Sequence, residues 1–512
     1  MTHKDIKNTV RKQLKKEYPD WKRLKKNEKK AIAKQVLSEV VNDYDYSQPV
    51  CTPFPELLGI DTQVGINDKI MNLEEMEQLI SDFNNSNLFR FTDKNGHPAI
   101  KDKELRLIDE IINNQIINKL LSYEGFTPSM REYMPSMFLR AELLKAIKYP
   151  EISYRKFCGD NGDYDGHKKD NAFTGRDQKQ TRAFIGLALN KNQFLSHIQM
   201  SQFRSNLTFE QQVNLTVYIL YHFNKSGLLK DGALHCADST ELAVDSARPL
   251  AVLKVMGKKI RIYNDIDCDC GKRRNKSDKS VYVTGYRMHT LTAICPKTGQ
   301  SYPLISLLAP ANHHDSHFLP YLAKLGKAMG LEVNLITADE AYHDKKGLML
   351  AETGVYLVKP PNAKVSVPDN VEAATMQVTL GEFCEVPMNY MGVTADGHEY
   401  KCAAHSGECP RSHTCSQFRV IPMDNGRFQP IVYGSAEAAK AIELRKNGER
   451  PFNLIKKREG LDVTRVRSQH ALLARCTITT MTTLLLEIIG TRRKRKEKKS
   501  QIQYELPLAS GF

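Results

Sequence analysis

Three acidic residues in this sequence occupy positions at which carboxylates could share a divalent metal ion. Asp238 ends the short apolar run 234–238 and Asp339 follows the apolar run 333–338, so each is expected at the end of a buried strand. Ligand-binding groups collect at that edge of an open α/β sheet. A single Asp there more often caps the next turn, but two on neighbouring strands favour a metal site. Glu340 points to the opposite side of a continuing strand and is left out of the site.

Glu449 is the third candidate acid. Arg445, Glu449 and Lys456 are spaced by four and seven residues, which places them on one face of a helix. Pro451 lacks a backbone N–H and is expected to kink that helix just past Glu449. The same spacing is also that of a solvated ion pair. The position of this segment, after the two strand acids, is what favours a catalytic interpretation.

The elements that must hold these acids follow from the periodicity of the chain. The sequence predicts strands over 281–295, 301–309 and 355–358, a helix over 316–329 with Asp315 as its N-cap, and helical sequence over 435–461. Three strands in hairpin order, a helix, and then strands that end in acids describe a mixed α/β sheet.

The first 230 residues are predicted to be mainly helical. Apolar spacing indicates helices over 104–121 and 137–147, and Ser153 can cap a following helix that begins near Tyr154. A helix, a tight turn and a second helix are the outline of a DNA-reading unit, and equally of any helical bundle.

Taken in order, the motifs resemble the Asp-Asp-Glu transposases of bacterial insertion sequences, whose catalytic domain has a ribonuclease H-like fold. In that family the first Asp stands in an Asp-Ser-Thr context, the second in Ala-Asp-x-Ala-Tyr, and the Glu in Tyr-x2-Arg-x3-Glu-x6-Lys. Asp238, Asp339 and Glu449 have these contexts here. The Tyr of the signature falls at Ile442, so no role of that Tyr is carried over.

Further phrases extend the resemblance over roughly residues 130–480. Residues 285–289 and 311–316 are similar to supporting motifs of the catalytic domain. In the helical part, residues 142–147, 153–155, 196–197 and 203–204 are similar to the N-terminal DNA-binding part of the family.

The resemblance implies metal-dependent cleavage of DNA at element ends, strand transfer into target DNA, and a homodimer that brings two ends together. Asp238, Asp339 and Glu449 would hold Mg²⁺ or Mn²⁺, as a pair of ions, because these cations prefer carboxylate oxygens. Basic residues near the acids would hold DNA phosphates. The candidate DNA-binding residues are Arg445, Lys456, Arg287 and Lys279.

The charge balance is consistent with a polyanionic partner. The 512 residues include 74 Lys and Arg against 59 Asp and Glu, a net charge of +15, and basic residues are dense over 11–30 and 492–499. Nucleic acid is the favoured partner, a membrane surface the lesser one, and a solvated tail the simplest alternative. No apolar segment typical of a signal peptide or a membrane span is evident, which predicts a cytoplasmic, nucleoid-associated protein.

A cysteine-bearing segment carries a separate signal. Cys384, Cys402, Cys409 and Cys415, with His405 and His413 nearby, are candidate ligands of a structural Zn²⁺. Loose reduced cysteines are an equal alternative, since no Cys-x2-Cys pair is present. Related transposases often have a Cys-rich stretch at this place, and the eleven cysteines of the chain fit a reducing compartment.

The predicted fold is therefore a ribonuclease H-like mixed sheet with flanking helices, preceded by a helical DNA-binding region and split by the Cys-bearing insertion. The predicted domains are a basic N-terminal segment (1–45), the helical region (46–230), the catalytic domain (231–363 and 430–490), the insertion (364–429) and a basic tail (491–512). Two alternatives remain for the function. One is a non-catalytic DNA-binding relative, which the presence of all three acids disfavours, and the other is a nuclease of the same fold without strand transfer.

Overall fold

The computed structural model describes most of the chain in segments. These are residues 3–42, 70–83, 99–121, 126–159, 177–187, 194–229, 233–255, 258–274, 280–342, 348–360, 436–461 and 463–505, with single residues and short pieces between them, including parts of 371–421.

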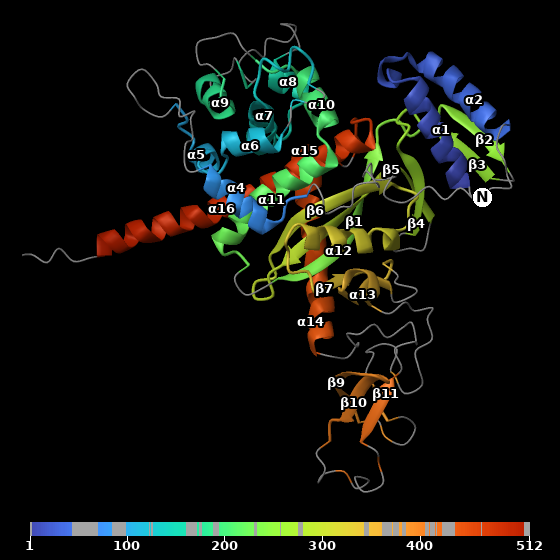
Figure 1. The fold of residues 1–512 in the computed structure, drawn as a ribbon, viewed down its shortest axis with the longest axis vertical. Coiled ribbons are helices and arrows are strands. Elements are labelled where there is room, and N and C mark those ends of the chain that lie inside the picture. Colours follow the sequence, from blue (N-terminus) through green and yellow to red (C-terminus); the bar gives the residue numbers. More distant parts are fainter. Residues whose placement is uncertain are drawn as a thin grey trace, which may run out of the picture.

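A mixed sheet forms the centre of the protein (Figure 1). Its central strand β1 (Leu234–Val244) pairs antiparallel with β5 (Ser280–Ile294) and parallel with β7 (Leu335–Ala338), which pairs parallel with β8 (Tyr356–Val358). The first part of β5 also pairs with β4 (Asp269–Arg274) and its second part with β6 (Ser301–Pro310). The short strand β12 (Val463–Thr464) adds to the end of β1. The sheet and its flanking helices confirm the predicted mixed α/β class.

Strand β1 is longer than the sequence pattern indicated. It continues six residues beyond Asp238 because residues 234–243 pair without interruption with β5. Asp238 therefore lies within a strand and not at its end, which corrects the prediction. Asp339 directly follows β7, as predicted.

Two helix predictions also need correction. The helix predicted over 104–121 is divided into α5 (Lys103–Asp109) and α6 (Asn114–Leu120), because the Asn113 side chain accepts hydrogen bonds from Gln115 and Ile116 and begins a new helix. The helix predicted over 316–329 is a 3₁₀ turn, η2 (Asp315–His317), followed by α12 (Leu319–Ala328).

Asp315 does not cap that helix. The imidazole of His314 accepts the hydrogen bond from the Ser316 N–H instead, and the carboxylate of Asp315 binds Arg287. A hydrogen bond from the charged Arg287 is stronger than one from a neutral backbone N–H. Asp315 therefore pairs with Arg287 and leaves the Ser316 N–H to His314.

The helical region shares one hydrophobic core with the sheet. Helices α7 (Pro135–Lys148), α10 (His197–Asn206) and α11 (Phe209–Ser226) pack around the long C-terminal helix α16 (Gln469–Glu505), which also packs on β6 (Figure 1). The remaining helices of this region are α4 (Leu73–Asp82), α8 (Tyr154–Cys158) and α9 (Gln178–Ile185), and Ser153 caps α8 as predicted. Residues Gln469–Gly490 of α16 are long and apolar enough to cross a membrane, but 83% of that window is buried inside the protein.

Two smaller units flank the main body. Helices α1 (His3–Glu17) and α2 (Lys26–Asn42) pack on the hairpin of β2 (Ala251–Val255) and β3 (Lys258–Ile262), with a core of their own. In the insertion, β9 (Met388–Thr394), β10 (Gly397–Cys402) and β11 (Phe418–Ile421) form a small antiparallel sheet below α14 (Ala436–Arg445) in Figure 1.

A buried ion pair joins two helices of the helical region. Glu142 of α7 is fully buried and pairs with Arg204 of α10, while the Tyr154 hydroxyl donates to the second Glu142 oxygen at 2.7 Å. The Arg204 guanidinium also lies 4.0 Å from the centre of the Tyr154 ring. A buried carboxylate that loses such a partner retains its desolvation penalty.

Replacing Arg204 by Met is therefore expected to lower the free energy of unfolding by about 3 kcal/mol or more, since it removes the cation that neutralises the buried Glu142 carboxylate. Urea unfolding measures this loss. Lys225→Met is the matched control, because the Lys225–Glu77 pair is about half exposed on both sides, and its loss should lower the free energy of unfolding much less. If the two variants lost the same free energy of unfolding, the stabilising role of the buried Arg204–Glu142 pair would be contradicted.

Candidate active site

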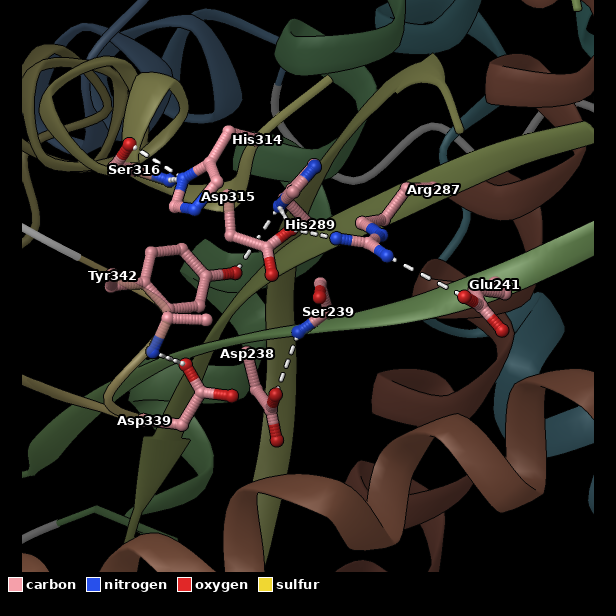
Figure 2. Close-up of polar contacts among 11 residues, drawn as sticks. Asp238, Ser239, Glu241, Arg287, His289, His314, Asp315, Ser316, Asp339 and Tyr342 are labelled. Carbon is pink, nitrogen blue, oxygen red and sulfur yellow. Dashed lines mark hydrogen bonds and ion pairs between the residues drawn. The ribbon is translucent and has the colours of Figure 1, made fainter. Parts of the chain in front are cut away.

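The pairing of β1 with β7 brings the two strand acids together. Ala237 lies opposite Ala338 in the parallel register, and the next residue on each strand is the candidate acid, Asp238 or Asp339. Figure 2 shows the two carboxylates side by side. A backbone N–H orients each of them: Ser239 donates to Asp238 Oδ1 at 2.7 Å, and Ala341 donates to Asp339 Oδ1 at 3.0 Å.

The segment that carries Glu449 is not one continuous helix. Helix α14 ends at Arg445, the 3₁₀ turn η3 (Lys446–Glu449) follows, and α15 (Arg450–Glu459) begins with Pro451 in its first turn. A 3₁₀ turn places side chains at a different angular interval from an α-helix, so the predicted common face for Arg445, Glu449 and Lys456 is interrupted. The structure thus corrects the single helix and agrees with the predicted break near Pro451.

Gly448 holds this turn against β1. A Cβ atom at Gly448 would lie 2.5 Å from the Cys236 Sγ atom, so only glycine permits the present approach. The contact places Glu449, the next residue, over the strand that carries Asp238. Glu449 itself is exposed, and its charge contributes to the raised pKa of Asp238.

The site concentrates negative charge in a poorly hydrated place. Burial, opposed by the Ser239 N–H and reinforced by Asp339 and Glu449, raises the pKa of Asp238 to about 7. Burial and the nearby Asp315 raise the pKa of Asp339. The Arg445 charge opposes the shift at both acids.

An unsatisfied oxygen makes the site suitable for a cation. Among the residues that the structure describes, Asp238 Oδ2 is buried without a hydrogen-bond partner. Hard oxygen ligands of this kind suit Mg²⁺ or Mn²⁺. Within the same described part of the chain, no three His, Cys, Asp or Glu side chains stand close enough to hold one ion in common. The geometry therefore supports the Asp238–Asp339 pair directly, with Glu449 adjacent on η3.

The four candidate DNA-binding residues have different surroundings. Arg445 is half-buried at the end of α14 and acts electrostatically on both strand acids. Lys456 is half-buried on α15, beyond the 3₁₀ turn. Arg287 forms ion pairs with Asp315 at 2.7 Å and Glu241 at 3.4 Å, so its guanidinium has a role within the protein, and its contact with DNA stays a prediction. Lys279 lies outside the described residues.

The predicted zinc ligands lie in the insertion, of which the structure describes only parts. Cys384, Cys402, Cys409 and Cys415 are half-buried free thiols, and in the described part of the insertion no three of them form a metal-binding group. His405 and His413 lie outside the described residues. The zinc site thus has support from the sequence alone.

Sequence reasoning missed several contacts that shape the site. Gly448 and Cys236 set the distance between η3 and β1. Tyr342 and His289 belong to the matched motifs, but the hydrogen bond between their side chains was not predicted. A glycine directly before Glu449 was a usable signal for close packing. The contacts of Cys236 and His289 depend on pairing between distant segments and left no local signal.

No protein-family model matches this chain, and no curated protein sequence matches it.

Replacing Gly448 by Ala should lower the free energy of unfolding by about 1–3 kcal/mol, because the new methyl group overlaps Cys236 Sγ. Adding Cys236→Ala to this variant removes the sulfur atom and should recover most of the lost stability. In a double-mutant cycle, the double variant should therefore be more stable than the sum of the two single effects predicts. Gly490→Ala in α16 is the control, since no described atom lies within 4 Å of the added Cβ. If the effects of the two substitutions on stability simply added, the close contact between Gly448 and Cys236 would be contradicted.

The raised pKa of Asp238 predicts a pH dependence of stability. Its ordinary value is 3.8 and its value in the folded protein is about 7, so the folded state binds more protons between these pH values. Stability of the metal-free protein therefore falls as pH rises through that window. Asp238→Asn should remove the loss and raise Tm relative to wild type more at pH 8 than at pH 5. Asp20→Asn is the control: Asp20 is exposed, so its substitution should change Tm little at either pH. If Asp238→Asn raised Tm equally at pH 8 and pH 5, ionisation of Asp238 would not be the cause of the pH dependence.

Proposed function

We propose that this protein is a DNA transposase that cleaves the ends of a mobile element and joins them to target DNA. The observation that carries the proposal is the placement of Asp238 and Asp339 on adjacent parallel strands, with Glu449 held over the same strand by the Gly448–Cys236 contact. These are the three acids whose sequence contexts resemble those of the Asp-Asp-Glu transposases.

The topology supports a ribonuclease H-like catalytic domain. Strands β1, β5 and β6 form the antiparallel part, helix α12 follows, and β7 and β8 continue the sheet parallel to β1. The long segment between β8 and α14 contains the separate β9–β11 sheet, which agrees with an insertion into such a domain.

Asp238 and Asp339 would bind Mg²⁺ or Mn²⁺ through their carboxylates, and Glu449 would complete the site. A pair of such ions activates the attacking oxygen and stabilises the leaving oxygen of a phosphodiester. The chain's own contribution is orientation: a backbone N–H group fixes one oxygen of each strand acid, and among the described residues the second oxygen of Asp238 has no hydrogen-bond partner. Arg445 lies where it can hold a DNA phosphate beside them.

The rest of the chain supports a nucleic-acid partner. The net charge of +15 attracts DNA, and the helical region packs on the same core as the sheet that carries the acids. We further propose a cytoplasmic protein on the nucleoid that acts as a homodimer, because two element ends must be joined in one event.

The function is tested with the full chain and a supercoiled plasmid that carries its gene with the flanking DNA. Asp238→Asn, Asp339→Asn and Glu449→Gln each remove one negative charge at nearly constant size. Each should reduce Mg²⁺-dependent cleavage about 100-fold or more and leave DNA affinity almost unchanged, because binding depends on the basic surface. Mn²⁺ should replace Mg²⁺, and Ca²⁺ should support binding with little cleavage.

Glu340→Gln is the matched control, because Glu340 is exposed beside Asp339 and stands outside the proposed site. It should retain most of the activity. A triad variant that cleaves at the wild-type rate would exclude that residue. Cleavage without joined products would identify a nuclease, and binding without cleavage by the wild-type protein would identify a non-catalytic DNA-binding protein.

A further inference from the structure

A layer of buried and half-buried polar side chains lies on the face of the sheet opposite Asp238. Side chains alternate along a strand, so Asp238 and its neighbour Ser239 in β1 face opposite sides. Ser239 pairs in register with His289 of β5, and Glu241 with Arg287, so these four residues share the second face. Figure 2 shows this layer with Tyr342 and Asp315 next to it.

His289 is held firmly within the layer. Its ring stacks on Phe318 with 3.8 Å between ring centres and an angle of 8° between the planes. Burial and the nearby Arg287 keep the pKa of His289 well below its usual value, so the imidazole is neutral. Its Nδ1 atom lies 3.2 Å from the Tyr342 hydroxyl, within hydrogen-bond distance.

An ion pair fixes the segment that supplies Phe318. Arg287 donates to Asp315 Oδ1 at 2.7 Å, and Asp315 belongs to the 3₁₀ turn that directly precedes Phe318. Both partners are largely buried, with side-chain exposures of 15% and 8%, so the pair is shielded from solvent. The stack on His289 is therefore held from two sides, by β5 and by η2.

Tyr342 connects this layer to the catalytic acid Asp339. Its backbone N–H donates to the Asp339 carbonyl at 3.2 Å, and the Ala341 N–H donates to Asp339 Oδ1 at 3.0 Å. The turn from Asp339 to Tyr342 thus sets the orientation of the Asp339 carboxylate. Fully buried, Tyr342 closes the turn by placing its hydroxyl against His289.

We propose that Tyr342 is the positioning residue for Asp339, anchored through its hydroxyl to the His289 layer on the opposite face of the sheet. This inference rests on the proposed function, since it assigns a purpose to the Asp339 geometry. Tyr342 does not touch the metal or the DNA in this scheme. Removal of an outer partner of a ligand typically weakens metal binding about 10- to 100-fold.

Tyr342→Phe in the full chain tests the proposal, because it keeps the ring and removes only the hydroxyl. Tyr302→Phe is the matched control: Tyr302 of β6 is also buried, and its hydroxyl donates to Gln300 at 2.8 Å, away from the acids. Phe318→Leu is a second variant, which leaves Tyr342 intact and removes the stack on His289.

Two measurements are made on each variant. Mn²⁺ titration followed by electron paramagnetic resonance should show the Kd raised about 10-fold in Tyr342→Phe and less in Phe318→Leu, with Tyr302→Phe at the wild-type value. Amide hydrogen exchange should be faster over residues 339–342 in Tyr342→Phe than in the control.

The outcomes separate the two proposals. Unchanged exchange over 339–342 and an unchanged Mn²⁺ Kd in Tyr342→Phe would overturn the positioning role. Faster exchange of that turn in a protein whose wild-type form binds no Mn²⁺ would support the positioning role and contradict the proposed metal-dependent function.

Discussion

The parallel pairing of β1 with β7 is the contact on which the site depends. It places two acids from segments about a hundred residues apart next to each other and fixes their register. A one-residue slip would turn every side chain of β7 to the other face, so the pairing must be held strictly. The buried apolar side chains of both strands, together with β8 and β5 on either side, supply that restraint.

This arrangement has an electrostatic cost that the surroundings only partly offset. Both carboxylates lose hydration by burial, and neighbouring acids add repulsion, from Asp339 at Asp238 and from Asp315 at Asp339, so the pKa of each is raised. One backbone N–H per acid and the half-buried Arg445 reduce the cost. The remaining unsatisfied oxygen of Asp238 is the feature that a divalent cation would satisfy. A site of this kind lowers stability without its ligand and favours the state that binds it.

Sequence patterns predicted the parts of this site that depend on local structure. The strand before Asp339, the break at Pro451 and the cap at Ser153 follow from neighbouring residues, and the structure agrees with each. The prediction that the first strand ends at Asp238 was wrong. Strand β1 continues past Asp238 because it pairs with β5, some fifty residues away in the chain.

The roles of Asp315 and Arg287 were also beyond local reasoning. The sequence suggested a helix cap for one and a DNA contact for the other, and the structure joins them in a buried ion pair. Their proximity arises only when β5 and the segment after β6 are packed together. Long-range pairing therefore accounts for most of the difference between the predicted and the observed site.

The central claim is that Asp238 and Asp339 bind a divalent metal ion together. Anomalous X-ray diffraction at the manganese edge, from crystals of the full chain grown with Mn²⁺, tests it directly. A peak between the Asp238 and Asp339 carboxylates, absent from crystals of Asp238→Asn grown in the same way, is the predicted result. Ordered carboxylates at this position with no peak between them, at a Mn²⁺ concentration that supports cleavage, would contradict the account.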